Sequence, residues 1–187
     1  MNIKQRRTYR IQHIEPPVQN FYGGLTKTGQ SWSRSWGDDG YYQKGLPQGG
    51  NRFQDNGDGT ITDIVTGLMW IKDPSELGGP WGYSGNPYQM NWYDAINNCE
   101  NLEYAGYSDW RLPNIKELES IMHYGRCYPA IDTNYFYNVQ SGCYWSSTLC
   151  EWYDWYVWVS YFWDGYRSNY PRDYYYYNYV RPVRGGI

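Results

Sequence analysis

Residues 143–179 of this chain read CYWSSTLCEWYDWYVWVSYFWDGYRSNYPRDYYYYNY, and nearly every second position is tyrosine or tryptophan. Hydrophobic cores are built mainly from leucine, isoleucine, valine and phenylalanine, whose side chains carry no polar atom. Tyrosine and tryptophan instead combine a large contact area with a polar group, which suits a binding surface. The composition therefore predicts that this stretch is a ligand-binding face and that the remaining residues are its scaffold.

The same stretch predicts a set of short strands. Tyr144–Thr148 and Trp155–Phe162 have strand character, and Asp164-Gly165 is a hairpin turn signal. Residues 166–179 are then a third strand or a long irregular excursion. The core side chains expected from this region are Trp145, Trp155, Val157, Val159 and Phe162.

Other positions in the stretch are expected to be exposed, because successive side chains of a strand point to opposite faces. The run Tyr174–Tyr177 therefore cannot all point inward, and an exposed aromatic patch of that size marks an interaction site. The alternative is a set of core strands with incidental surface tyrosines. The predicted ligand-binding residues are Leu149, Glu151, Tyr153, Asp154, Trp158, Ser160, Trp163, Asp164, Tyr166, Ser168, Tyr170, Asp173, Tyr174 and Tyr176.

Length and charge limit the classes of function. A chain of 187 residues suits one domain, and we expect an N-terminal arm over residues 1–20 and a ligand-binding domain over residues 21–187. A net charge of −3 gives no reason to expect nucleic-acid or anionic-membrane binding. No apolar run approaches the roughly 20 residues of a membrane span, so membrane insertion is not expected. The basic N-terminus has no following apolar stretch, so no signal peptide is expected. The localisation stays open, and a virion-associated protein and export by another route both fit the sequence.

The cysteines and histidines do not predict a metal site. The four cysteines, at positions 99, 127, 143 and 150, have no short paired spacing, and the chain holds only two histidines. Zinc sites in proteins are usually built from closely spaced pairs of such residues. We therefore expect neither a metal nor another cofactor.

Residues 52–72 predict a β-hairpin. Residues 56–59, Asn-Gly-Asp-Gly, accept the positive φ angles of a tight turn. Thr60–Ile64 has strand propensity, and Leu68–Ile71 is a short buried strand. Residues 55–59 also resemble a calcium loop, but they lack oxygen ligands at alternate positions closed by a distant glutamate, so we interpret them as a turn.

Two helices are predicted between these strand regions. Asn91 is expected to cap a helix that extends to about residue 104. Asn114 is expected to cap a second helix, in a capping box with Glu117 and with Gly125 as the C-cap. Helical spacing predicts buried stripes formed by Trp92, Ala95, Ile96, Cys99 and Leu102 in the first helix, and by Ile115, Leu118, Ile121 and Met122 in the second.

The pattern of these elements is α+β, because two helices precede a crowded set of short antiparallel strands. Residues 22–50 are rich in glycine, serine and glutamine, and we expect an ordered loop that aromatic residues such as Trp32 and Trp36 pin to the core. A flexible linker is the alternative. Arg111 and Arg181 are expected to pack against aromatic faces and carboxylates inside the scaffold.

Short motifs form an ordered set along the chain. They are Lys27–Gln30, Gly37–Gly40, Asp55–Thr60, Thr66–Trp70, Asp109–Pro113 with Glu117-Leu118, Tyr144–Ser147 and Val180–Gly186. Together, from about residue 27 to residue 186, they resemble the Lcl C-terminal domain family. The resemblance implies the C-type lectin fold of formylglycine-generating enzymes, with two helices packed on a small twisted antiparallel sheet and long loops that form a binding face.

A narrower resemblance concerns residues 149–177. Members of that family serve as variable proteins of diversity-generating retroelements, in which adenines of a template are miscopied. Miscopied AAY codons yield Tyr, Ser, Asp, Asn, Cys, Leu, Gly and Arg, and AAG codons reach Trp. These residue types fill the segment, which is bracketed by the family motifs YWSS and YVRPVRGG. The segment thus resembles one variant of a diversified binding face.

The function that this resemblance implies is recognition of a receptor or other ligand, without catalysis. The partner would be an unknown protein ligand, such as a surface receptor, or a glycan, and the chain would be a monomer. A carbohydrate-binding lectin or adhesin is the alternative, although no calcium-liganding carboxylate cluster is visible. Formylglycine-generating enzymes use two cysteines and a metal, but no histidine lies near Cys143 and Cys150 to activate a thiolate or complete a copper site.

The resemblance also bears on the cysteines. Many family members carry cysteine where this chain has Pro182, so Cys99 is expected to be a free thiol. Cys127 and Cys143 remain as the candidate disulfide pair. Cys150 is interpreted as one of the residues sampled in the diversified segment.

Overall fold

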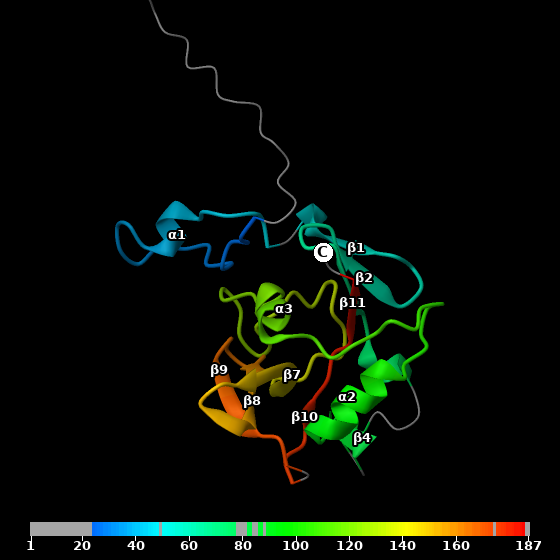
Figure 1. Cartoon of the computed structure of the whole chain (residues 1–187). Coiled ribbons are helices and arrows are strands. Elements are labelled where there is room, and N and C mark those ends of the chain that lie inside the picture. Colours follow the sequence, from blue (N-terminus) through cyan, green and yellow to red (C-terminus); the bar gives the residue numbers. More distant parts are fainter. Residues whose placement is uncertain are drawn as a thin grey trace, which may run out of the picture.

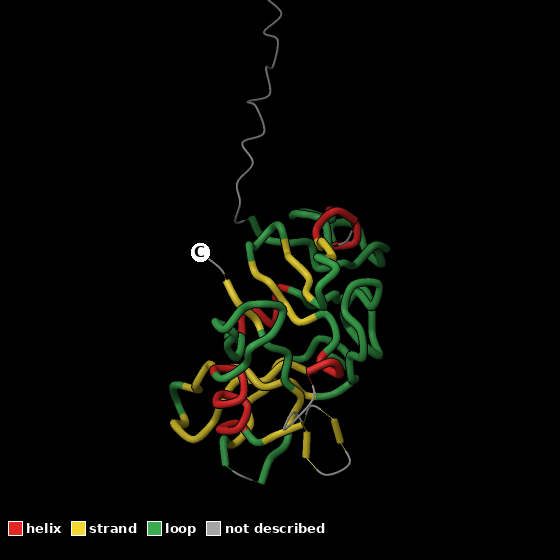
Figure 2. The backbone as a smooth tube through the Cα atoms, turned by 90° about the vertical axis from the view of Figure 1, so that its right-hand side faces the viewer, coloured by secondary structure: helices red, strands yellow, loops and turns green. Residues whose placement is uncertain are grey.

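The computed structural model describes residues 24–48, 50–77, 82–83, 86–87, 89–173 and 175–185. The predicted arm over residues 1–20 lies outside these ranges. Two main sheets and two main helices form most of the described chain, which confirms the α+β class (Figure 1). Seen after a 90° turn, the helices are short and loops make up a large part of the backbone (Figure 2).

The first sheet contains the predicted hairpin. Its strands are β1 (Phe53–Asp55), β2 (Thr60–Asp63), β3 (Leu68–Ile71) and β11 (Val183–Gly185), in the order β1-β2-β3-β11, and all pairs are antiparallel. In the β1–β2 turn, the Asp55 carboxylate accepts from the Gly57 amide at 3.0 Å, and the Asp58 carboxylate accepts from the Thr60 amide at 3.0 Å. These aspartates therefore build the turn, as the interpretation of residues 55–59 predicts.

The second sheet is built from the aromatic-rich stretch. Its order is β6-β10-β7-β8-β9, formed by β6 (Gln89–Met90), β7 (Cys143–Cys150), β8 (Tyr153–Tyr161), β9 (Arg167–Pro171) and β10 (Asn178–Tyr179). The predicted turn at Asp164-Gly165 joins β8 to β9, with Gly165 at φ +86°. One expectation is wrong, because β10 runs parallel to β7 and the sheet is therefore mixed. A further pair of two-residue strands is β4 (Gly82–Tyr83) with β5 (Asn86–Pro87).

Helix α2 (Trp92–Glu100) covers one face of the second sheet. The Asn91 side chain accepts from the Asp94 amide at 2.9 Å, which confirms the predicted N-cap. The helix ends before residue 104, but its apolar stripe is as expected, with Ala95 and Cys99 fully buried. That stripe packs with Trp145, Val157 and Val159 of β7 and β8.

Helix α3 (Ile115–Ser120) covers the other face. Asn114 and Glu117 form the predicted capping box. Leu118, Ile121 and Met122 pack between the two sheets, in a cluster that includes Phe53, Ile61, Leu68, Trp70 and Val183 of the first sheet and Tyr144 of the second. The middle of β7 and β8 is therefore enclosed on both sides.

The predicted C-cap at Gly125 is wrong, because α3 ends at Ser120 with Ile121 as its C-cap. Gly125 serves a different purpose. A Cβ atom at this position would lie 2.2 Å from the carbonyl oxygen of Gly29, so only glycine allows the segment 24–48 to approach this closely.

The segment 24–48, which includes α1 (Asp39–Tyr42), is ordered against the domain, but its aromatics do not pin it. Trp32 and Trp36 are exposed, with 53% and 81% of their surface accessible. The segment is held by polar contacts, in which Tyr124 donates its amide to the Thr28 carbonyl at 2.7 Å and Gln48 donates to the Met122 carbonyl at 2.9 Å. The expectation of an ordered loop is confirmed, and the expected cause is wrong.

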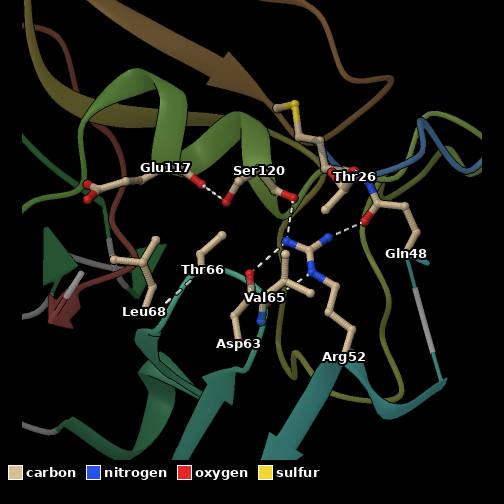
Figure 3. A network of polar contacts seen from close by, with 10 residues as sticks. Thr26, Gln48, Arg52, Asp63, Val65, Thr66, Leu68, Glu117 and Ser120 are labelled. Atoms are coloured by element: carbon tan, nitrogen blue, oxygen red, sulfur yellow. Dashed lines mark hydrogen bonds and ion pairs between the residues drawn. The ribbon is translucent and has the colours of Figure 1, made fainter. Parts of the chain in front are cut away.

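A buried ion pair ties this segment to the first sheet and α3. Arg52, in the short 3-10 helix Gly50–Arg52, contacts the Asp63 carboxylate through Nη2 at 2.7 Å and Nε at 3.1 Å (Figure 3). Its guanidinium also donates to the Gln48 side chain and to the Ser120 carbonyl. Both charged side chains are almost fully buried, so the pairing offsets a large desolvation penalty.

Two further arginines lie where the sequence predicts. Arg111 makes two bonds of 2.7 Å to the Glu117 carboxylate. Arg181 is fully buried, lies 5.5 Å from the ring centroid of Phe136 and donates to the Ile71 carbonyl at 2.7 Å. Burial lowers the pKa of the Arg181 guanidinium below its usual range. Both side chains therefore belong to the scaffold.

All four cysteines are free thiols. The free state of Cys99 agrees with the expectation, and the candidate pairing of Cys127 with Cys143 is wrong. Cys127 is exposed, whereas Cys143 is buried on the face of the second sheet that α2 covers. The two side chains therefore occupy different environments.

Candidate ligand-binding surface

The predicted ligand-binding residues do not form one continuous face. Most are exposed, Trp158, Ser168 and Tyr170 are half-buried, Ser160 is buried, and Tyr174 lies outside the described residues. Most of the exposed and half-buried ones separate into three groups along the second sheet. These are the tip of the β7–β8 hairpin, a tyrosine cluster on β8 and β9, and the turn between those two strands.

The hairpin tip, defined as residues 149–156, is the most exposed aromatic surface of the second sheet. The accessible fractions are 89% for Trp152, 68% for Trp155, 59% for Tyr153 and 47% for Leu149. The rings of Tyr153 and Tyr156 lie 5.5 Å apart at an interplanar angle of 53°. The pairing of Cys150 with Tyr153 closes the hairpin, and Arg172 donates its amide to the Trp155 carbonyl at 2.7 Å. The tip is therefore a hydrogen-bonded element that presents its rings to solvent.

The prediction that Trp155 is a core residue, which follows from the alternation along β8, is wrong, because its side chain is exposed. The alternation is real, since Val157 and Val159 on the same strand are fully buried. The strand pairing is, however, irregular between Trp145 and Leu149, and the hairpin extends beyond the part that packs on α2 and α3. Trp155 and Trp152 therefore join the candidate surface, although neither is among the predicted residues.

The tyrosine cluster consists of Tyr161, Tyr166, Tyr170 and Tyr176. Ring centroids lie 5.9 Å apart for Tyr161 and Tyr166, 6.3 Å for Tyr161 and Tyr170, and 5.7 Å for Tyr170 and Tyr176. The hydroxyl oxygens of Tyr161 and Tyr170 are hydrogen-bonded at 2.5 Å. Burial, followed by this hydrogen bond, raises the pKa of Tyr161 well above its usual range, so the Tyr161 hydroxyl stays protonated at physiological pH. Two predicted residues, Tyr166 and Tyr170, thus meet at Tyr161, which the sequence did not single out, and the predicted Tyr176 joins them through Tyr170.

The β8–β9 turn carries the third group. The ring of Trp163 contacts that of Tyr128 edge to face at 4.6 Å, and both side chains are about half exposed. The Asp164 carboxylate accepts from the Tyr166 amide at 3.0 Å and so supports the turn. Because β8 spans Tyr153–Tyr161, this group lies roughly 30 Å from the hairpin tip, too far for one small ligand to contact both.

The predicted residues Trp158, Ser160, Ser168 and Asp173 lie outside these groups. Trp158 is half-buried on the α3 side, where the Arg167 guanidinium lies 4.8 Å from its ring centroid and pairs with Glu119 at 3.1 Å. Ser160 is fully buried, so the prediction that it faces outward is wrong. Its side chain lies on the α3 side of the sheet, and this face is covered just as the α2 side is. A side chain that alternates away from α2 is therefore still buried at this position.

The acidic residues of the hairpin tip differ from those of the scaffold. Asp63, Asp109, Glu117 and Asp132 each pair with an arginine. Glu151 and Asp154 are exposed and make no ion pair or side-chain hydrogen bond within the described ranges. The Asp173 carboxylate, which lies outside the tip, accepts a hydrogen bond from the Tyr175 amide at 3.0 Å. The tip therefore presents negative charge beside its aromatic rings.

Neither a metal site nor an activated nucleophile is evident in the described part of the chain. Its His, Cys, Asp and Glu side chains form no group of three or more that could hold an ion. Burial raises the pKa of the Cys143 thiol to about 12, which disfavours the thiolate. Cys150 is also buried.

Two hollows lie outside the three aromatic groups. One, of about 380 Å³, is lined by residues 103–108, and the other, of about 500 Å³, by Asp73, Thr133 and residues 136–140. No predicted ligand-binding residue lines either hollow. Among the described helices, none is long and apolar enough to cross a membrane.

Comparison with protein families identifies the scaffold. The model of the Lcl C-terminal domain matches residues 59–184, and the chain belongs to that family. The match covers both sheets except β1, as well as α2 and α3, whereas the segment 24–48 precedes it. A search of curated proteins finds no match to the chain.

Proposed function

We propose that this member of the Lcl C-terminal domain family is a ligand-binding protein whose contact surface is the hairpin tip together with the tyrosine cluster further along β8. The observation that carries the proposal is the exposure of Trp152, Tyr153 and Trp155 at the end of a hairpin whose middle contains the fully buried Trp145, Val157 and Val159. Exposed aromatic patches mark interaction sites, and tryptophan and tyrosine dominate the energetics of such contacts. The ligand is proposed to be a protein, such as a surface receptor.

The mechanism is affinity without bond chemistry. The aromatic side chains would lose water in pockets of the partner, and neighbouring polar residues would set specificity. The buried, protonated Cys143 and the buried Cys150 support this proposal, because the cysteine chemistry of formylglycine-generating enzymes requires accessible thiolates.

The finer proposal is that the domain has a C-type-lectin-like fold and is the variable protein of a diversity-generating retroelement. Support comes from the division within the second sheet. Residues of the flanking motifs, such as Tyr144, Trp145 and Arg181, are buried and make specific contacts. Side chains of the hairpin tip make few contacts, so substitutions there leave the scaffold intact. A diversified surface requires this separation between fixed and variable positions.

The DNA downstream of the gene tests the retroelement proposal. We expect a near-copy of the codons for residues 149–177, differing only where the template has adenine, beside a reverse-transcriptase gene. A gene without such a copy, found with unchanged codons in many isolates, would contradict it.

A carbohydrate-binding lectin or adhesin is the second candidate function. The exposed rings of Trp152 and Trp155 favour it, because aromatic faces stack on sugars. A glycan array and a protein array, each probed with the wild-type chain and with a Trp152→Ala/Trp155→Ala variant, separate the two functions. We expect signals that depend on these tryptophans on the protein array. Tryptophan-dependent signals on glycans alone would favour the lectin.

A further inference from the structure

We infer that the hairpin tip selects a protein partner that presents lysine or arginine side chains. The inference rests on the proposed ligand-binding function and adds the chemical class of the partner. It depends on two features of the tip among the described residues, which are the absence of ion pairs at its carboxylates and the absence of cations over its rings.

The carboxylates of the tip lack partners in this chain. Glu151 and Asp154 are exposed, one on each side of the Trp152-Tyr153 pair, and neither forms an ion pair in the described ranges. The nearest cation beyond the tip in sequence is Arg167, which pairs with Glu119. Arg172 lies beside the tip, because its amide donates to the Trp155 carbonyl at 2.7 Å, but its guanidinium lies 5.9 Å from the ring centroid of Trp92 on α2 and forms no ion pair with Glu151 or Asp154. The exposed carboxylates of Glu151, Asp154 and Asp173 outnumber this one arginine, so the tip attracts positive groups on a partner.

The rings of the tip also lack the partners that rings have elsewhere in this chain. Arginine or lysine lies over aromatic rings at Trp32, Tyr107, Tyr137 and Trp158, at 3.7 to 4.8 Å from the ring centroids. In the described residues, no cation lies over Trp152, Tyr153 or Trp155. The faces of these rings carry negative electrostatic potential and bind a cation within about 6 Å.

The geometry of the tyrosine pair suits a cationic side chain. The rings of Tyr153 and Tyr156 contact each other, with centroids 5.5 Å apart and planes inclined at 53°, and the Tyr153 side chain remains 59% exposed to a partner. Asp154 lies between them in sequence. A lysine or arginine side chain from the partner could contact the rings with its alkyl part and place its charge near a carboxylate.

The experiment uses an oligo-arginine peptide with a fluorescent label, and oligo-glutamine and oligo-glutamate peptides of equal length. Anisotropy measures their binding to the wild-type chain at low and at high salt. We expect the oligo-arginine peptide alone to bind, and we expect a Glu151→Gln/Asp154→Asn variant to bind it about tenfold more weakly. A Trp152→Ala/Tyr153→Ala variant should weaken binding about fivefold, because cation–π contacts are lost.

The matched control is a Glu100→Gln/Glu103→Gln variant. It changes the net charge equally at two exposed acidic residues away from the tip, at and just beyond the end of α2. We expect its affinity for the oligo-arginine peptide to stay within about twofold of wild type. Circular dichroism melting curves establish that each variant is folded.

Three results would overturn the inference. Equal losses in the tip variant and the control variant would mean that net charge alone attracts the peptide. Binding of all three peptides, or of none, would mean that the tip does not select cations. A dimer in sedimentation experiments that disappears in the tip variant would mean that the occupant is a second copy of this chain. None of these results would by itself contradict the proposed ligand-binding function. A near-copy of the codons for residues 149–177 beside the gene would support that function whichever result is found.

Discussion

Trp145 and Trp155 lie on paired strands of one sheet, yet their surroundings are opposite. Trp145 is fully buried, and its Nε1–H donates to the Met90 carbonyl at 2.8 Å. Trp155 is 68% exposed, and its indole makes no hydrogen bond within the described residues. The comparison shows that strand periodicity assigns a side chain to a face, whereas the helices that cover the sheet decide whether that face is buried.

The same difference separates the scaffold from the hairpin tip as a whole. In the scaffold, charged and aromatic side chains have specific partners, as Arg52 and Asp63 do. At the tip, Glu151, Trp152 and Asp154 are exposed without such partners. Substitutions should therefore affect folding in the scaffold and binding at the tip, and the predictions below test this separation.

The largest effect is expected for Trp145→Ala. Removal of a fully buried indole loses its transfer free energy and leaves a cavity, so the free energy of unfolding should fall by about 3–5 kcal/mol. Trp155→Ala is the matched control and should change it by less than about 0.5 kcal/mol. Urea denaturation measures both values. Similar losses in the two variants would remove the distinction between the two tryptophans.

The next effect is expected for Asp63→Asn, which leaves the buried Arg52 guanidinium without its counter-charge. The free energy of unfolding should fall by roughly 3 kcal/mol, because the arginine stays desolvated. Asp109→Asn removes the partner of Arg184 from an exposed pair and should cost less than about 1 kcal/mol. Thermal unfolding of both variants gives the comparison. An Asp63→Asn variant with an unchanged melting temperature would show that the pair is not needed for folding.

A smaller loss is expected for Asn114→Ala, which removes the acceptor for the Lys116 and Glu117 amides at the start of α3. Substitution of an N-cap typically costs about 1 kcal/mol. Lys116→Ala, on the exposed side of the same turn, is the control and should be nearly neutral. Urea denaturation distinguishes the two, and equal values would exclude a role for the cap.

The smallest effects are expected for Trp152→Ala and Tyr176→Ala. Both side chains are exposed, and we expect changes of about 0.5 kcal/mol or less in the free energy of unfolding. The same variants should reduce ligand binding if the proposed function is correct. A large drop in melting temperature for Tyr176→Ala would place the tyrosine cluster in the core and remove it from the candidate surface.

Local chemistry explains which parts of the fold were predictable. The caps at Asn91 and Asn114 and the turn at residues 55–59 depend on a few neighbouring residues, and the structure confirms them. The exposure of Trp155 and the burial of Ser160 depend on how far α2 and α3 reach over the sheet. Strand periodicity contains no information about that reach.

The same limit applies to the candidate surface. Composition identified residues 149–177 as the region that presents aromatics, but not that its residues divide into separate groups at the two ends of β8. Tyr128 joins one group from a distant loop through its contact with Trp163, and no sequence pattern connects the two. Contacts between segments distant in sequence are set by the tertiary fold.

The ion pair of Arg52 and Asp63 has a consequence for where the domain begins as a folding unit. The family match starts at Gly59, so it includes the aspartate and excludes the arginine. A shortened chain cut at that boundary would bury a carboxylate with no counter-charge and would lose β1, which leaves β2 as an unprotected sheet edge. The smallest autonomous chain therefore begins upstream of Gln48, which also contacts Arg52.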